Sequence, residues 1–212
     1  MKRLILAVFL FVGSLAHTQS SAGVYKVRWT IDSRITNSFT INNTGTNRLE
    51  IPANLYDSVT NQILAIVKEE LHTDAKLFYP LNSNGKEMRF NASSQQVGGL
   101  PRGNKRKAAA TEYLEYYVKF KIRVGVNKTF SVGTELASYN RLRPFVKVKM
   151  KAYGVDKRCK FRKRSKKTGF KSLHSFEYNL GGTTMTNTNA LPINEVVDMV
   201  FQGLEKFRSK VR

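Results

Sequence analysis

The chain has 212 residues, a length that suits a single domain with its own hydrophobic core. Hydrophobic residues make up 41% of it, and this composition excludes an intrinsically disordered protein despite a formal net charge of +21. The charge is uneven: between residues 99 and 191 there are 22 Lys and Arg residues against 5 Asp and Glu residues, which favours anionic partners. The single cysteine, Cys159, excludes an internal disulfide and a metal site built from cysteines; we expect a half-buried strand residue rather than an intermolecular bridge.

The N-terminus has the pattern of a secretory signal peptide. Lys2 and Arg3 precede an apolar run over residues 4–12, and Ser14-Leu15-Ala16 forms a small-x-small cleavage motif. The apolar run is too short for a membrane span. We therefore predict a signal peptide over residues 1–16, with cleavage sites available up to residue 22, followed by a single α+β domain over residues 23–212. The exported protein is expected in the periplasm or cell envelope of a bacterium, or secreted from the cell.

The periodicity of apolar side chains predicts the elements of the first half. Strict alternation predicts a strand over residues 24–32, and the Asn- and Thr-rich segment 33–50 predicts a hairpin or loop. Apolar residues at three- and four-residue steps predict a helix at about 53–72, and a short strand follows near 75–79. The polar, Gly-rich segment at about 91–110 predicts a long flexible loop.

Alternation resumes in the second half of the chain. The segments EYYVKFKIRVGV and RPFVKVKMKAYGV predict two strands, over residues 115–126 and 143–155. A returning strand is predicted over residues 170–180, and the Gly, Thr and Asn of residues 181–190 predict a linker. The amphipathic C-terminal segment predicts a helix at about 193–211, with acidic residues near its start and basic residues near its end.

Together these elements predict an α+β fold. We expect a single, mainly antiparallel sheet of about five to seven strands, with the helices at about 53–72 and 193–211 packed on one face. Their order is similar to that of small α+β modules of bacterial cell-envelope assembly systems. This similarity is one of architecture and does not by itself assign a function.

The polar phase of three predicted strands is basic. Its members are Lys26 and Arg28; Lys119, Lys121 and Arg123; Lys147, Lys149 and Lys151. One interpretation is a cationic sheet face that binds an extended anion. Neighbouring like charges destabilise a sheet, and a purely structural surface would normally intersperse both signs. The alternative is that these strands are not neighbours, or that lysines protect exposed strand edges against aggregation.

The run KRCKFRKRSKK adds to the same charge, and it predicts a basic hairpin with a turn near residues 165–169. Its cations are Lys157, Arg158, Lys160, Arg162, Lys163, Arg164, Lys166 and Lys167. The export signal argues against nucleic acid and against a nuclear address. The partners that fit an exported protein are an anionic envelope polymer, lipid head groups with peripheral membrane contact, or an acidic protein. Three interleaved aromatic residues, Phe161, Phe170 and Phe176, could touch lipid or lie in the core.

No motif for catalysis, metal binding or a cofactor is present, so we assign no catalytic residue, no metal ligand and no cofactor. His72 lies at the end of the first predicted helix, where a cationic side chain suits the helix dipole. The leading hypothesis is an exported, non-catalytic binding or envelope-assembly accessory module. Two alternatives stay open: a small extracytoplasmic enzyme acting on an anionic substrate around His174, with Ser172, Ser175 or Glu177, and a structural subunit of an envelope complex.

Overall fold

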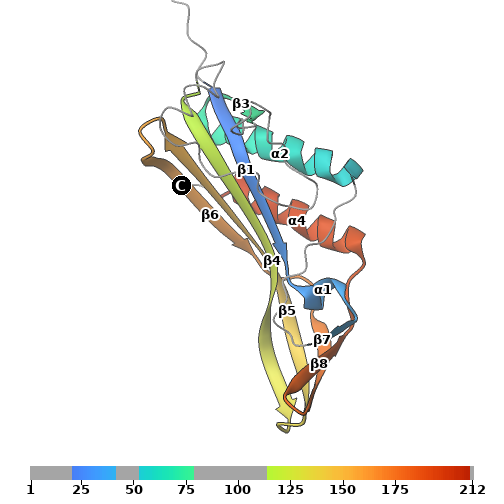
Figure 1. The fold of residues 1–212 in the computed structure, drawn as a ribbon. Helices are drawn as coiled ribbons and strands as arrows, with labels where there is room; N and C mark the ends of the chain where they lie inside the picture. The colour runs from blue at the N-terminus through green and yellow to red at the C-terminus, as the bar shows by residue number, and fades with distance from the viewer. Residues whose placement is uncertain (1–20, 42–52, 79–113, 211–212) are drawn as a thin grey trace, which may run out of the picture.

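The computed structural model describes residues 21–41, 53–78 and 114–210, and these contain eight strands and three helices (Figure 1). The predicted signal peptide and the predicted loop at about 91–110 lie outside the described residues. The strands are β1 (Ser21–Ile31), β2 (Phe39–Ile41), β3 (Asp74–Leu77), β4 (Tyr116–Gly133), β5 (Ala137–Gly154), β6 (Cys159–Lys167), β7 (Leu173–Leu180) and β8 (Thr183–Thr188). The helices are α1 (Ser33–Thr36), α2 (Ala53–Leu71) and α4 (Ile193–Arg208).

All eight strands belong to one sheet with mixed strand directions. The order is β2-β8-β7-β5-β4-β1-β3, and β6 pairs with the remaining part of β5. Strand β1 runs parallel to both of its neighbours, β3 and β4, whereas the other pairs are antiparallel. The prediction of a single, mainly antiparallel sheet of five to seven strands is therefore wrong. Parallel pairing requires a long crossover, which α2 supplies between β1 and β3, and alternation within a strand carries no information about its partner's direction.

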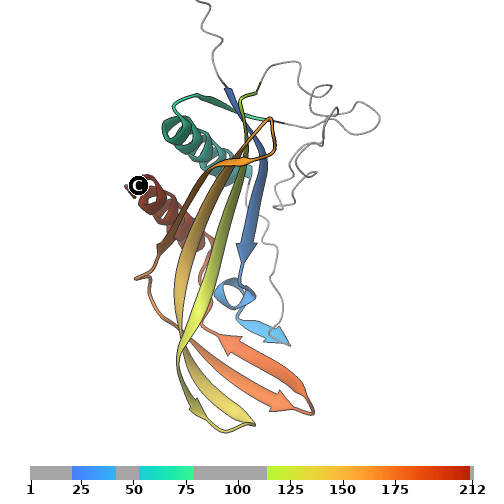
Figure 2. The ribbon, with the colours of Figure 1, turned by 90° about the vertical axis from the view of Figure 1, so that its left-hand side faces the viewer.

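The long strands β4 and β5 extend through the whole sheet. The sheet has two halves along this pair, which differ in the strands that flank it. In the first half, β5 pairs with β6 over residues 146–153, and β4 pairs with β1. In the second half, β5 pairs with β7 over residues 137–142. The order of β4 and β5 across the picture reverses between the two halves in both ribbon views, so the sheet turns over along this pair (Figures 1 and 2). A two-stranded ribbon of this length accumulates such a right-handed twist.

Helices α2 and α4 lie side by side on one face of the first half (Figure 1). The core beneath them consists of the apolar phase of the strands, including Val118, Phe120 and Val148, which have no exposed surface. Helix α4 approaches β5 closely because Gly203 has no side chain: a Cβ there would lie 2.4 Å from Cγ1 of Val146. No helix in the described part of the chain is long and apolar enough to cross a membrane.

The segment expected as a hairpin or loop and the segment expected as a linker both contain regular structure. The segment 33–50 holds α1, whose N-cap Asp32 accepts a hydrogen bond from the backbone N–H of Arg34, and then β2. The segment 181–190 holds β8, which joins β2 to β7. A sequence of Thr and Asn such as TTMTNT lacks apolar alternation, so its pairing depends on the neighbouring strands.

Candidate functional site

The basic residues of four adjacent strands form rows across the first half of the sheet. Strand β1 pairs with β4, β4 with β5 and β5 with β6, so residues in register lie next to one another. The first row is Lys119, Lys151 and Arg162. The second row is Arg28, Lys121, Lys149 and Arg164, and the third is Arg123, Lys147 and Lys166. We call these ten residues the cationic face.

The geometry of a sheet sets the spacing of these charges. Neighbouring strands lie about 4.8 Å apart, and alternate residues along one strand about 6.7 Å apart. The residues between the cations, such as Ile122 and Met150, are buried under the helices. The cationic face therefore points away from α2 and α4, and the strands that carry it are neighbours.

No carboxylate neutralises the cationic face within the part of the chain that the structure describes. The ion pairs there involve other cations, and each lies at a helix, in the β5–β6 turn or on the second half of the sheet. Desolvation lowers the pKa of Lys121 below the ordinary lysine value, and four neighbouring cations of the face lower it further. The charge of Lys147 lowers the pKa of Lys149, with desolvation and three further cations of the face adding to the effect. The surface thus maintains a strong positive potential.

An aromatic ring closes one end of the cationic face. Phe145 lies in the same phase of β5 as Lys147, two residues earlier, and its ring covers Gly125, where a Cβ would lie 2.7 Å from the ring. The guanidinium of Arg123 lies 5.8 Å and Nζ of Lys166 4.4 Å from the ring centroid. Cation–π contacts hold both side chains at this end of the face. No local pattern in the sequence singles out Phe145, because its role depends on the pairing of β5 with β4 and β6.

Lys163 is one of the predicted site residues, but it lies on the opposite side of the sheet. It pairs with the buried Met150 in register, its side chain is 9% exposed, and its Nζ forms an ion pair with Glu70 of α2. The same Nζ lies 5.2 Å from the ring centroid of Phe207 on α4. Lys163 therefore joins the two helices to β6. Unbroken runs of charge hide the alternation of a strand, so the sequence could not separate Lys163 from its neighbours.

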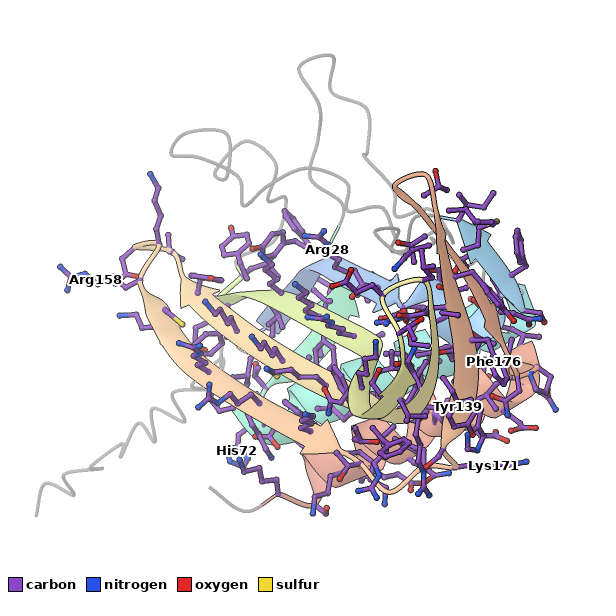
Figure 3. All side chains as sticks on the ribbon, turned by 90° about the horizontal axis from the view of Figure 1, so that it is seen from below. Arg28, His72, Tyr139, Arg158, Lys171 and Phe176 are labelled. Carbon is purple, nitrogen blue, oxygen red and sulfur yellow. The ribbon has the colours of Figure 1, made fainter. Side chains whose placement is uncertain are left out.

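The prediction of a turn near residues 165–169 in the basic run is also wrong. Residues 159–167 form the edge strand β6, and the turn lies before it, between Gly154 and Arg158. Lys157 and Arg158 belong to that turn, which Figure 3 shows at the end of the sheet beyond the face. Lys160 forms an ion pair with Asp156 at 2.9 Å. Lys167 pairs with Val146 in register and has the same phase as Lys163.

Cys159 is exposed, which contradicts the expectation of a half-buried strand residue. The ladder between β5 and β6 is irregular at this point, since Phe161 pairs with Ala152 but Cys159 with Tyr153. The one residue that separates them, Lys160, has no register partner, so the alternation shifts phase. The shift turns Cys159 away from the core to which Phe161 packs.

His174, the centre of the enzyme hypothesis, lies on an exposed strand. It stacks on Tyr139, with ring centroids 5.5 Å apart, and its Nδ1 forms a hydrogen bond with the Tyr139 hydroxyl. Ser175 follows it in β7 and is fully buried on the other face, where Glu177 forms an ion pair with Lys128. Alternation thus separates His174 from both residues. Within the described residues, no group of three His, Cys, Asp or Glu side chains could hold a metal ion.

A second surface, apolar and aromatic, lies on the second half of the sheet. Val132, Tyr139, Phe176 and Phe39 fall in consecutive register from β4 to β2, across Asn187 of β8. Figure 3 shows Tyr139 and Phe176 together, far from Arg28 of the cationic face. Its exposed members, each at least 45% exposed, are Phe39, Ile41, Phe130, Val132, Leu136, Phe176, Tyr178 and Leu180. Of the three aromatic residues singled out in the sequence, Phe176 is exposed here, whereas Phe161 and Phe170 pack against the core.

No protein-family model and no curated protein matches the chain. Among solved structures, one match is a Helicobacter pylori protein described as a homolog of neuraminyllactose-binding hemagglutinin. It shares 7% sequence identity with a TM-score of 0.41, and the match covers 89% of this chain and 81% of that chain. A likeness at this level carries no argument about the function of the present protein.

Proposed function

We propose that this protein is an exported binding module that docks a polyanion of the cell envelope on its cationic face. The observation that carries the proposal is the set of ten cations on four adjacent strands, with no carboxylate among them in the described part of the chain. Such an arrangement opposes folding, because like charges stand directly opposite one another across three ladders. A bound anion with closely spaced phosphate or carboxylate groups would relieve this repulsion.

A polymer or a lipid head-group layer fits this surface better than a folded acidic protein. Interfaces between proteins have an apolar centre with charged residues depleted there. The centre of the cationic face is instead Lys121 and Lys149, and its aromatic ring, Phe145, is 7% exposed beneath two cations. The envelope as the compartment rests on the predicted signal peptide at residues 1–16.

The test uses two anions that differ in source: vesicles containing phosphatidylglycerol and soluble polyphosphate. The variant Lys121→Gln/Lys149→Gln/Arg164→Gln removes most of the middle row of the face. Each Lys or Arg near an anionic surface contributes about 1 kcal/mol, so we expect a loss of affinity of about 100-fold. The variant Lys68→Gln/Lys171→Gln/Lys206→Gln has the same net charge, with changes on α2, the β6–β7 connection and α4, and should bind like the wild type.

The comparison between the two probes identifies the source of the anion. Binding to vesicles alone indicates lipid head groups, and binding to polyphosphate indicates a polymer. Equal losses in the two triple variants would show that net charge alone attracts anions, and the proposal would then be wrong. Absence of binding to both anions at low salt would reject it as well.

A further inference from the structure

A pocket of about 550 Å³ opens at the junction of the two halves of the sheet. Its lining comes from β4, from β5 and from the connection between β6 and β7. The lining residues are Asn127, Thr129, Arg143, Pro144, Thr168, Gly169, Phe170 and Ser172. No triple variant above changes any of them.

The pocket exists because β5 changes its partner here. Pairing with β7 ends at Leu142, and pairing with β6 begins at Val146, so the three residues between them have no neighbour on that side. Pro144, which has no backbone N–H, lies in this interruption. The connection over residues 168–172 passes from one partner strand to the other and forms the facing wall.

Most polar groups of the lining have no partner within the described part of the chain. The guanidinium of Arg143, the amide of Asn127 and the hydroxyls of Thr168 and Ser172 take part in none of its hydrogen bonds or ion pairs, whereas the Thr129 hydroxyl donates to the carbonyl of Arg141 at 3.1 Å. Phe170, which packs against the core, and Pro144 add apolar surface. A guanidinium presents paired donors that match a phosphate or carboxylate, and hydroxyls and an amide suit a polyol.

The pocket continues the cationic face. Arg143, Phe145 and Lys147 share one phase of β5, and four strand residues span about 13 Å, so Arg143 lies beyond the ring that closes the face. An anion that extends along β5 past Phe145 would reach this pocket next. Pockets of several hundred Å³ accommodate ligands larger than a single phosphate ion.

We propose that this pocket binds one sugar-sized unit bearing a phosphate or carboxylate, as the end or branch of the polyanion on the cationic face. This inference rests on the proposed function for the rest of the ligand, but the pocket itself is tested without it. Arg143 contacts the oxyanion, and Asn127, Thr168 and Ser172 contact the hydroxyls. Phe170 and Pro144 contact the apolar side of the ring.

The experiment titrates the full-length mature protein by NMR or calorimetry with glucose 6-phosphate, glucuronate, neutral glucose and inorganic phosphate. We expect at least one acidic sugar to bind at least tenfold more tightly than glucose and than inorganic phosphate. The acidic sugar with the higher affinity shows whether the pocket prefers a phosphate or a carboxylate. Arg143→Gln should weaken that binding at least tenfold. The matched control is Arg141→Gln, because Arg141 is an exposed residue of the same strand outside the pocket. It should change the affinity less than twofold.

The inference fails if neither acidic sugar binds more tightly than glucose, if inorganic phosphate binds as tightly as the acidic sugars, or if the two arginine variants lose affinity equally. Its failure is distinguishable from failure of the proposed function. The Lys121→Gln/Lys149→Gln/Arg164→Gln variant should retain the acidic sugar while it loses the polyanion, and Ser172→Ala should weaken only the sugar. Loss of the acidic sugar in the face variant would also contradict a separate pocket.

Discussion

Lys149 occupies the centre of the cationic face, with Lys121 and Arg164 directly across its two ladders. Like charges at these positions destabilise a sheet by a few tenths of a kcal/mol per pair. We therefore expect Lys149→Gln to raise the free energy of unfolding by about 0.5–1 kcal/mol, as measured by urea denaturation at low salt, and to weaken polyanion binding. Lys171→Gln serves as the control and should leave stability unchanged. A loss of stability in Lys149→Gln would show that the repulsion is compensated within the fold.

Lys163 is adjacent to Arg162 and Arg164 in sequence, but we expect its substitution to have the opposite effects to Lys149→Gln: lower stability and unchanged polyanion binding. Its ion pair with Glu70 lies under the helices, where the Lys163 side chain is 9% exposed and the Glu70 side chain 11% exposed. Removing one partner of a buried ion pair destabilises a protein by up to about 3 kcal/mol. Lys163→Gln should therefore unfold at lower urea concentration, yet bind polyphosphate as tightly as the wild type while folded. Weaker binding with unchanged stability would place Lys163 on the cationic face.

The pairing of strand β1 limits where a signal peptide can be cleaved. Ser21 pairs with Asp74, and Ala22, which pairs with Ala75 and Tyr116, has no exposed surface. Cleavage after Ala22 would remove two paired residues from a strand that has a neighbour on each side, β3 and β4. If the proposed signal peptide is cleaved, we expect the mature N-terminus to lie at or before Ser21, as determined by mass spectrometry of the intact chain. A mature protein that begins at Gly23 would contradict this expectation, and an uncleaved chain would contradict the proposed signal peptide.

The sequence predicted elements better than it predicted their partners. Alternation placed strands at β1, β4 and β5, and three- and four-residue spacing placed helices at α2 and α4. It did not reveal β8, whose TTMTNT has no apolar phase, and it placed the turn of the charged run after the strand β6, whereas the turn lies before it. The parallel pairing of β1 with β3 and β4 depends on the crossover through α2, which no local pattern encodes.

At the scale of the whole molecule, the candidate site depends on adjacency. The basic phase of β1, β4 and β5 was visible in the sequence, but whether these strands and β6 are neighbours is decided by long-range pairing. The same pairing makes Phe145 the end of the face and opens the pocket beside Arg143. Both features arise where β5 exchanges β7 for β6, so neither has a signature in the sequence.

The central claim is that the polyanion lies on the cationic face, and lysine footprinting tests it most directly. The mature protein is acetylated at low salt with and without polyphosphate, and the modification of each lysine is measured by mass spectrometry. We expect protection of six lysines of the face, and none at exposed lysines elsewhere, such as Lys171 and Lys206. The six are Lys119, Lys121, Lys147, Lys149, Lys151 and Lys166. Equal protection of all exposed lysines, or protection confined to those outside the face, would contradict the account.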